Sequence, residues 1–519
     1  MKHRFLTVAA ALLTLLTGIG TCAARTGDFP IRAFHLDFRT EVMTLDAMKS
    51  LVDRISERGI NTLVMEWEAA FPFDKHATLS NASAFTREEV ISFVDYCSGR
   101  GVEVIPLQNC FGHCEYILRH ERYRALREDP KDPSQVCPLK IAEATACFSG
   151  LFAEVASLHP SKYFHIGADE TYLLGLCGNC RAVADREGKS RLFVDYVKAM
   201  CDIVHRLGKT PVIWADIILK YPEALDELPD DLIFVDWNYG WEPDRFGKLA
   251  NLFSRGVKLW GAPALRSGPD NIYLTQWKKH FDNLAVFVEY AREHDYGGMI
   301  ETSWSTSGTY GYWFDNGYEV LSMQPVRLVY PMSAFRILEA ACCEAFVTDA
   351  PFEPEAFVLR YARTELGLDD AGASVLWRYF SMPQETVTVS DSGAKDASGR
   401  DLREVIDECV RMRDELARLK PRKGTEEAAH YLLMLDIRIN YLRFKAVEAR
   451  YQSASFDRSG IPELVSGLKT LLAEARTLDR RFARLNGGYL KAREIEYEHH
   501  AFGEDEIALR TTDKQHPIR

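Results

Sequence analysis

The sequence predicts an α/β fold, a (β/α)8 TIM barrel, followed by a C-terminal all-α region. Eight short apolar runs occur between residues 31 and 304, as expected of parallel strands buried on both faces. Amphipathic helical stretches separate most of these runs, and eight such repeats within about 310 residues are typical of a barrel. An open doubly wound sheet is the alternative. It would more often carry a glycine-rich loop after its first strand, where residues 37–40 here read Asp-Phe-Arg-Thr.

Helices are expected where apolar residues recur at helical spacing. Thr44–Arg58 and Ser190–Leu207 show this pattern. The stretch Thr86–Arg100 also begins with Thr86 and Glu89 in the spacing of a capping box. The eight strands are expected at Ile31–Phe38, Ile60–Trp67, Val102–Leu107, Lys162–Gly167, Thr210–Ala215, Leu232–Trp237, Val257–Gly261 and Gly298–Trp304.

Beyond Pro351 the strand-like runs disappear. Helices are expected at Leu402–Leu419, Glu426–Ser453 and Ile461–Leu485, and Ser390–Arg400 is expected to be a loop. We therefore divide the chain into a signal peptide at 1–24, a catalytic barrel at 25–350 and a helical domain at 351–519. The sequence leaves open whether the helical domain covers a barrel face, forms a homodimer or contributes a pocket residue.

The N-terminus has the pattern of an export signal. A short basic start precedes the apolar stretch Phe5–Leu16, which is too short for a comfortable membrane span, and small residues follow. A membrane-anchoring helix is the alternative. Cys22 stands where a bacterial lipoprotein carries its lipidated cysteine, but Thr21 is larger than the usual preceding residue, so a lipid anchor stays an open alternative. We expect an exported protein that is periplasmic, secreted or lipid-anchored at a bacterial cell surface.

Composition restricts the class of partner. The 519 residues include 63 Lys and Arg against 75 Asp and Glu, a net charge of −12, without a long basic run. This balance argues against nucleic acid as a partner. Hydrophobic residues make up 47% and charged residues 27% of the chain, which excludes wholesale disorder.

Carboxylates and tryptophans predominate at the expected carboxyl ends of the strands, where TIM barrels place their reacting groups. Carboxylates transfer protons and bind hydroxyls, and tryptophan faces stack on sugar rings, so the pattern indicates a pocket that cleaves glycosides. For any single tryptophan, core packing is the alternative. These side chains are His35, Asp37, Glu66, Glu68, Asn109, His113, Asp169, Glu170, Trp214, Asp216, Asp236, Trp237, Trp260, Glu301 and Trp304.

Two adjacent acids, Asp169 and Glu170, directly follow an apolar strand within residues 165–171, His-Ile-Gly-Ala-Asp-Glu-Thr. Adjacent carboxylates cannot easily flank a glycosidic bond as the usual pair does, so one acid is expected to protonate the leaving oxygen. For this role we expect burial beside an ionised Asp169 to raise the pKa of Glu170. A surface pair at a helix start is the alternative.

The pattern His-x-Gly-x-Asp-Glu resembles the signature of glycoside hydrolase family 20, the β-N-acetylhexosaminidases. Residues 106–119 resemble the strand-3 segment of the hexosaminidase D-like branch, and 297–304 resemble the strand-8 segment. The resemblance covers about 31–345. It implies substrate-assisted hydrolysis with retention, in which the substrate's 2-acetamido oxygen is the nucleophile. Asp169 would then orient the acetamido group, and Glu170 would be the acid and base.

The resemblance also implies a set of substrate-binding residues. Arg32 matches the family's sugar-binding arginine, and three tryptophans match its pocket wall. His113 would support the acid pair, and a structural histidine is the equal alternative. The candidates are Arg32, His113, Trp214, Trp237, Glu301 and Trp304.

The sequence departs from the family pattern after strands 7 and 8. The stretch Trp260–Leu265 lacks the tyrosine that bonds the acetamido oxygen, and we assign Tyr239 as its substitute. The usual Trp-x-Glu is Trp304-Ser-Thr, which leaves the preference between GalNAc and GlcNAc open; the hexosaminidase D-like branch favours galactosaminides. A catalytically silent glycan-binding protein and a hydrolase of unsubstituted hexosides are the alternative functions.

Four cysteines flank the expected active-site loops, at Cys110, Cys114, Cys177 and Cys180. Disulfides between them, free thiols and a structural zinc site remain open, with disulfides favoured by the compartment. We expect no cofactor and no catalytic metal, because no His/Asp cluster has ligand spacing.

Overall fold

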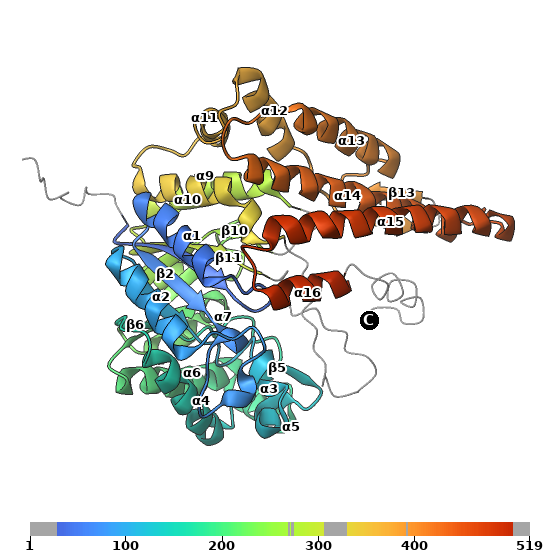
Figure 1. The fold of residues 1–519 in the computed structure, drawn as a ribbon. Coiled ribbons are helices and arrows are strands. Elements are labelled where there is room, and N and C mark those ends of the chain that lie inside the picture. The colour runs from blue at the N-terminus through green and yellow to red at the C-terminus, as the bar shows by residue number, and fades with distance from the viewer. Residues whose placement is uncertain (1–28, 268–269, 271–274, 306–329, 391–392, 502–519) are drawn as a thin grey trace, which may run out of the picture.

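The computed structural model describes residues 29–267, 270, 275–305, 330–390 and 393–501 (Figure 1). The expected signal peptide at 1–24 and the candidate lipid anchor at Cys22 lie outside these ranges. None of the described helices combines the length and the apolar character that a membrane span needs.

Eight parallel strands close into a barrel, which confirms the predicted fold class. Each strand pairs with its neighbour along the chain, and the first pairs with the last from Ile31 opposite Gly298 to Phe34 opposite Glu301. A short strand, β10 (Ala264–Arg266), adds to the edge of β11. The barrel strands are β1 (Ile31–Asp37), β2 (Thr62–Glu66), β3 (Glu103–Leu107), β6 (Tyr163–His165), β7 (Thr210–Trp214), β8 (Ile233–Trp237), β9 (Lys258–Ala262) and β11 (Gly298–Ser303).

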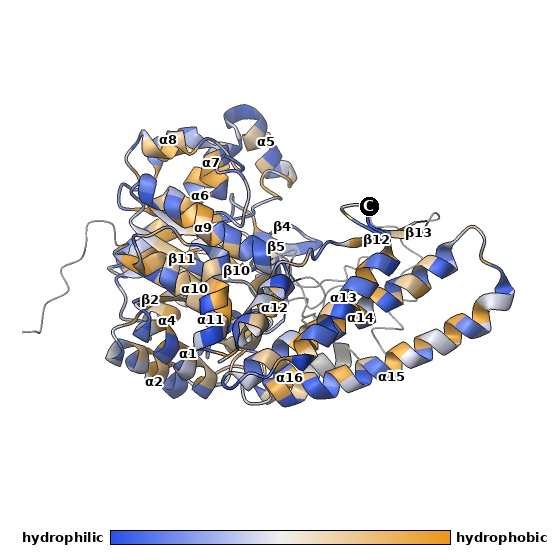
Figure 2. Cartoon of the chain, turned by 90° about the horizontal axis from the view of Figure 1, so that it is seen from above, coloured by the Kyte–Doolittle hydropathy of each residue, from blue (hydrophilic) through white to orange (hydrophobic). Residues whose placement is uncertain are grey.

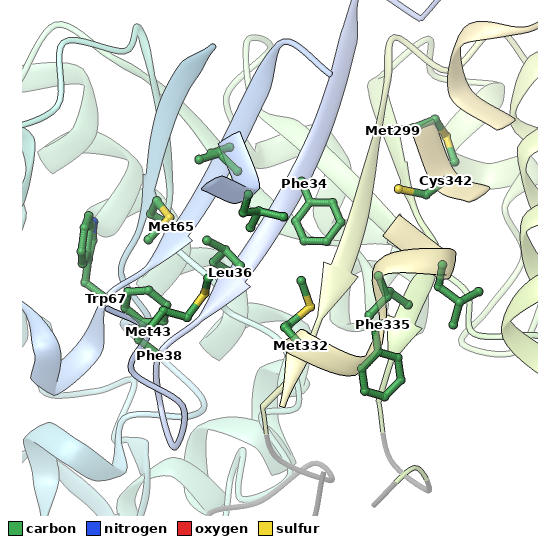
Figure 3. Packing of buried hydrophobic residues seen from close by; sticks show 14 of the residues in the cluster. Phe34, Leu36, Phe38, Met43, Met65, Trp67, Met299, Met332, Phe335 and Cys342 are labelled. Carbon is green, nitrogen blue, oxygen red and sulfur yellow. The ribbon is translucent and has the colours of Figure 1, made fainter. Parts of the chain in front are cut away.

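Alternating side chains divide the strands between two apolar clusters. Ala33, Val64 and Ile300 belong to the cluster inside the barrel. Phe34 and Met65, each one residue away, face the outer helices (Figure 3). Because both faces are buried, the strands are apolar almost throughout, which explains why the sequence shows them so clearly.

Helices cover the outer face of the barrel. Thr86 and Glu89 form the predicted capping box at the start of α2. A small antiparallel hairpin of β4 (Arg127–Asp129) and β5 (Asp132–Val136) follows β3. The helices of this part are α1 (Leu45–Glu57), α2 (Arg87–Gly99), α3 (Glu115–Leu118), α4 (Ile141–Ala156), α5 (Gly178–Glu187), α6 (Lys189–Arg206), α7 (Asp216–Lys220), α8 (Ala250–Phe253), α9 (Trp277–Glu293) and α10 (Arg336–Val347).

The C-terminal region is helical, and its long helices α14 and α15 extend from the barrel as an antiparallel pair with mixed hydropathy (Figure 2). It packs on the barrel layer through Trp277 of α9, whose ring centroid lies 4.8 Å from Phe380 and 5.7 Å from Tyr431. The domain boundary at 350 stays a prediction. The helices are α11 (Pro354–Thr364), α12 (Asp370–Phe380), α13 (Leu402–Arg418), α14 (Thr425–Gln452), α15 (Ile461–Asn486) and α16 (Ala492–Ala501).

One local expectation in this region was wrong. The stretch predicted as a loop, Ser390–Arg400, contains strand β13 (Gly393–Asp396), which pairs with β12 (Val387–Ser390). Val387 and Ala394 are buried, so a two-stranded hairpin forms where the Ser-, Asp- and Gly-rich composition indicated an irregular loop.

Candidate active site

Asp169 and Glu170 follow β6 directly and converge on one imidazole. Nε2 of His113 lies 3.4 Å from Oδ2 of Asp169 and 3.2 Å from Oε2 of Glu170. The hydroxyl of Tyr172 donates to Oε1 of Glu170 at 2.6 Å. Oδ1 of Asp169 is buried and has no hydrogen-bond partner among the described residues. The acid pair is therefore held from the His113 side, and one buried carboxylate oxygen remains for a substrate donor.

The loops that carry these groups are strained and tightly packed. The φ angles of Ala168 and Glu170 are 71° and 48°, and that of His113 is 52°, in the left-handed region that non-glycine residues avoid. A Cβ on Gly167 would lie 2.0 Å from Oδ1 of Asn109, and one on Gly112 would lie 2.2 Å from the Asp169 carbonyl oxygen. Such strain clusters at functional sites, and here it fixes where the two acids point.

The proton of this site resides on His113. Burial opposes a charged imidazole, but Asp169 and the hydrogen bonds to both acids raise the pKa of His113 well above its ordinary value. Burial also opposes ionisation of Glu170, yet the hydrogen bond and charge of His113 lower the pKa of Glu170. The expectation that burial raises the pKa of Glu170 was therefore wrong for the free site, because the imidazolium outweighs desolvation.

Asp216, the first residue of α7, anchors the backbone of the acid pair. Its Oδ2 accepts a hydrogen bond from the Glu170 amide at 3.1 Å. Burial and the neighbouring Asp169 raise the pKa of Asp216 to about 7. The sequence places Asp216 at a strand end, but this contact with the catalytic loop depends on the turn after β6.

Aromatic side chains from the ends of three strands meet near the acids. The ring centroids of Trp214 and Trp304 lie 5.7 Å apart, and those of Trp237 and Tyr239 lie 5.1 Å apart. Nε1 of Trp304 donates to the Tyr239 hydroxyl at 2.7 Å, which joins the two pairs. The tryptophans and Tyr239 thus form one continuous aromatic group.

Arg32 lies elsewhere, which contradicts its predicted role in substrate binding. It is at the amino end of β1, where its Nε donates to the Gly59 carbonyl at 2.7 Å and its Nη1 to the Phe29 carbonyl at 2.8 Å. The acid pair lies at the opposite, carboxyl end of the strands. Arg32 therefore ties loops together at the base of the barrel.

Arg39, which the sequence analysis did not identify, places a guanidinium group at the carboxyl end of the barrel strands, where the acid pair also lies. Its Nε lies 3.1 Å from each carboxylate oxygen of Asp37 and 3.8 Å from Oε1 of Glu66. The guanidinium carbon lies 5.0 Å from the ring centroid of Trp304. Burial opposes ionisation of Asp37, but Arg39 prevails and lowers the pKa of that carboxyl. The signal was present in the sequence, because Arg39 directly follows the carboxyl end of the first strand.

Glu301 also lies outside the pocket, against prediction. Its neighbour Ile300 faces the barrel interior, so Glu301 faces outward, where it interacts electrostatically with Cys342 of α10. Both carboxylate oxygens are buried without a hydrogen-bond partner among the described residues, and burial raises the pKa of Glu301 well above its ordinary value. The strand's two-residue periodicity explains the error.

Further carboxyl groups lie at the carboxyl end of β2. Oε2 of Glu66 lies 3.2 Å from Nε2 of His35, and its Oε1 accepts from Nδ2 of Asn109 at 2.6 Å. Glu68 is 3% exposed, and neither of its oxygens has a hydrogen-bond partner among the described residues. Burial and the neighbouring Glu66 raise the pKa of Glu68 well above its ordinary value, which favours the neutral form of this carboxyl.

The cysteines do not meet as the sequence suggested. The structure joins none of the eleven described cysteines by a disulfide, against the alternative that the sequence favoured. Sγ of Cys110 bonds the Ile166 carbonyl at 3.2 Å, away from Cys177 and Cys180. Those two cysteines instead face Cys137, a residue that the spacing argument did not consider.

The chain is similar to known glycoside hydrolases. Residues 29–289 match the family model described as glycosyl hydrolase family 20, catalytic domain. Hexosaminidase D of Bos taurus is 29% identical over 294 residues, which cover 53% of this chain and 84% of the bovine protein. Hexosaminidase D of Homo sapiens is 28% identical over 294 residues, 53% of this chain and 60% of the human protein.

Among solved structures, the chain resembles a β-N-acetylhexosaminidase from Bacteroides fragilis, with a TM-score of 0.47 and 20% identity over 64% of this chain and 69% of that one. The family assignment rests on the family model, which matches half of the chain and includes Asp169, Glu170 and His113. The chain therefore belongs to glycosyl hydrolase family 20 and is a glycoside hydrolase.

Proposed function

We propose that the protein is an exo-acting, retaining β-N-acetylhexosaminidase that removes terminal β-linked GalNAc or GlcNAc from glycans by substrate-assisted catalysis. The observation that carries this proposal is the convergence of Asp169 and Glu170 on Nε2 of His113, at 3.4 and 3.2 Å. Both acids stand on one side, so they serve as an orienting group and a proton donor, and the substrate supplies the nucleophile.

The first step forms a cyclic intermediate. The carbonyl oxygen of the 2-acetamido group attacks the anomeric carbon as the glycosidic bond breaks, and Glu170 gives its proton to the leaving oxygen. Asp169, whose buried Oδ1 has no hydrogen-bond partner among the described residues, accepts the acetamido N–H and stabilises the positive oxazolinium. Water then attacks the anomeric carbon, Glu170 takes a proton from that water, and the acetamido group is restored with net retention.

Glu170 needs a proton before it can act, and His113 is its source. In the free site the imidazole holds the proton and Glu170 is ionised. A bound sugar displaces water from the pocket and destabilises the buried ion pair, which favours transfer across the 3.2 Å contact from Nε2 of His113 to Oε2 of Glu170. His113 is thus a positioning and proton-holding residue for the acid.

The aromatic group and one arginine bind the sugar. Trp214, Trp237 and Trp304 enclose the acetamido methyl and one sugar face, and the Tyr239 hydroxyl donates to the acetamido oxygen. Arg39 takes the place that the sequence gave to Arg32, and its remaining N–H groups bond ring hydroxyls. The substrate is a glycan or glycoconjugate outside the cytoplasm, in keeping with the export-type N-terminus. The resemblance of residues 106–119 to the hexosaminidase D-like branch slightly favours GalNAc as the terminal sugar.

Asp169→Asn and Glu170→Gln, each isosteric, test the assignment. Each is expected to lower kcat on an aryl N-acetylhexosaminide by about 10²–10⁴-fold, whereas Asp185→Asn, an exposed control on α5, leaves kcat unchanged. Near-normal turnover by either active-site variant would contradict the proposal. Wild-type binding of N-acetylhexosamine without hydrolysis of any aryl glycoside would favour the silent glycan-binding protein instead.

A further inference from the structure

Four side chains with metal-binding atoms meet beside the active-site loops (Figure 2 labels their elements, β4, β5 and α5). Glu128 lies on β4, Cys137 follows β5, Cys177 is the N-cap of α5 and Cys180 lies in its first turn. One ligand atom of each lies within 4.8 Å of all the others. Glu128, Cys137 and Cys180 are buried and Cys177 is half-buried. We refer to these four residues as the cysteine–glutamate cluster.

We propose that the cysteine–glutamate cluster binds one structural zinc ion. Sγ of Cys137 lies 3.9 Å from Sγ of Cys177 and 3.5 Å from Sγ of Cys180. A tetrahedral zinc ion with bonds of about 2.3 Å to sulfur separates its sulfur ligands by about 3.8 Å. Oε2 of Glu128 is 3.3 Å from Sγ of Cys180, which suits the shorter zinc–oxygen bond. Three soft sulfurs and one carboxylate favour zinc over magnesium or calcium.

A disulfide accounts for this arrangement less well. Cys137 lies beside both other thiols, so a bond between any two leaves the third thiol unpaired beside the carboxylate of Glu128. Glu128 is 1% exposed, and the groups that face it in the cluster are the thiols of three cysteines. A buried group of carboxylate and thiols gains stability from a cation at its centre, because buried charge needs a partner.

The surrounding amides already orient the ligands. The Cys180 amide donates to Sγ of Cys177 at 3.4 Å, and the Cys177 amide donates to Oε1 of Glu128 at 2.8 Å. Such contacts fix ligand direction and stabilise the negative ligand atoms. Since four protein ligands fill a tetrahedral shell, no position is left for water or substrate, so the ion is structural and takes no part in hydrolysis.

The position of the cluster indicates what a bound ion would stabilise. The Cys114 amide donates to the Ser134 carbonyl at 3.0 Å, which attaches β5 to the loop that carries His113. The Leu173 amide donates to Oε1 of Gln135 at 2.8 Å, which attaches the same strand to the segment after Glu170. Zinc would add a strong bond between this hairpin and α5, and would hold both catalytic loops in register.

Metal analysis of the purified full-length protein tests the proposal without any assay of activity. We expect about one zinc per chain, retained through dialysis, in wild type and in Cys147→Ala, a half-buried cysteine outside the cluster. Cys177→Ala, the most accessible ligand, and Glu128→Gln, which preserves shape, are expected to lower zinc content or affinity at least tenfold while the protein stays folded by circular dichroism. Cobalt in place of zinc should give the visible absorption of a tetrahedral thiolate site, which Cys177→Ala abolishes.

Two results would overturn the proposal. One is wild-type protein, reduced and supplied with zinc during expression, that holds no more zinc than Cys177→Ala. The other is peptide mapping that finds a disulfide between any two of Cys137, Cys177 and Cys180. We expect the three thiols to react with a thiol reagent only after a chelator has removed the zinc. We also expect chelation to lower the Tm of the wild type and to leave the Tm of Cys177→Ala unchanged.

Discussion

Nε2 of His113 lies 3.2 Å from Oε2 of Glu170, and this contact sets the charge of the proposed catalytic acid. The imidazole carries the proton in the free site, because Asp169 also lies 3.4 Å from the same nitrogen. Protonation of the site therefore belongs to the three residues together, and the pH dependence of hydrolysis should report the group.

His113→Asn should move the basic limb of the kcat/KM pH profile to lower pH. Asparagine tolerates the left-handed backbone at φ 52°. In wild type the site keeps its proton until the pH passes the raised pKa of His113; in the variant the proton must reside on Glu170, an ordinarily stronger acid. Activity near neutral pH should fall roughly 10–100-fold with a smaller loss near pH 5. His205→Asn, at an exposed site on α6, is the control, and an unshifted basic limb in His113→Asn would refute the shared proton.

Arg39→Lys should weaken substrate binding, whereas Arg32→Lys should not. Lysine keeps the charge near Asp37 but loses the planar fork and the stacking on Trp304. We expect KM of an aryl N-acetylhexosaminide to rise about tenfold or more, since one charged hydrogen bond contributes about 1.5–3 kcal/mol. Steady-state kinetics of the two variants decide between the two arginines, and a larger effect at Arg32 would restore the assignment made from sequence.

Tyr239→Phe should lower kcat/KM about 10–100-fold on N-acetylhexosaminides. The change removes the hydroxyl that accepts from Nε1 of Trp304 at 2.7 Å and that we assign to the acetamido oxygen. Tyr96→Phe removes a hydroxyl that bonds Asp53 on the outer helices, and it should leave kcat/KM unchanged. Equal activity of Tyr239→Phe and wild type would remove Tyr239 from the site.

Asp216→Asn should become increasingly stabilising, relative to wild type, as the pH rises from about 4 to 7. The folded-state pKa of Asp216 is raised from 3.8 to about 7, so the folded protein holds a proton that the unfolded chain has lost. Wild-type stability therefore falls through this window, by at most about 1.4 kcal/mol per pH unit from this group. The amide oxygen of asparagine can still accept from the Glu170 amide. Thermal unfolding of both proteins at pH 4.5 and 7.5 measures the difference, and a pH-independent Tm difference would contradict the raised pKa.

Local sequence patterns were sufficient for the fold. Strands buried on both faces give apolar runs, so β1 and β8 end within one residue of their predicted limits. The capping box of Thr86 and Glu89 marked the start of α2. Such signals depend only on neighbouring residues, which explains their success.

The errors in the predicted site concern the strand end or face at which a side chain lies, and contacts between residues far apart in the sequence. The family resemblance assigns the sugar-binding role to Arg32, but Arg32 lies at the amino end of β1. The position of Arg39, just after the carboxyl end of that strand, indicates the arginine beside the acids more reliably. Glu301 faces outward because Ile300 faces inward. This alternation of side chains along a strand could have been predicted from the sequence. Glu128 could not be expected beside Cys180, because only the β4–β5 hairpin brings the two together.

The central claim, that the substrate's own acetamido group is the nucleophile, is tested most directly by varying that group. Wild-type kcat/KM is measured on aryl N-acetylhexosaminides whose acetyl methyl carries zero, one, two or three fluorines. Fluorine withdraws electrons from the carbonyl oxygen, so kcat/KM should fall steeply, by about tenfold or more per substitution, if attack by this oxygen contributes a large part of catalysis. A flat series, together with hydrolysis of the aryl hexoside that lacks the acetamido group, would contradict the account and point to an enzyme carboxylate as the nucleophile.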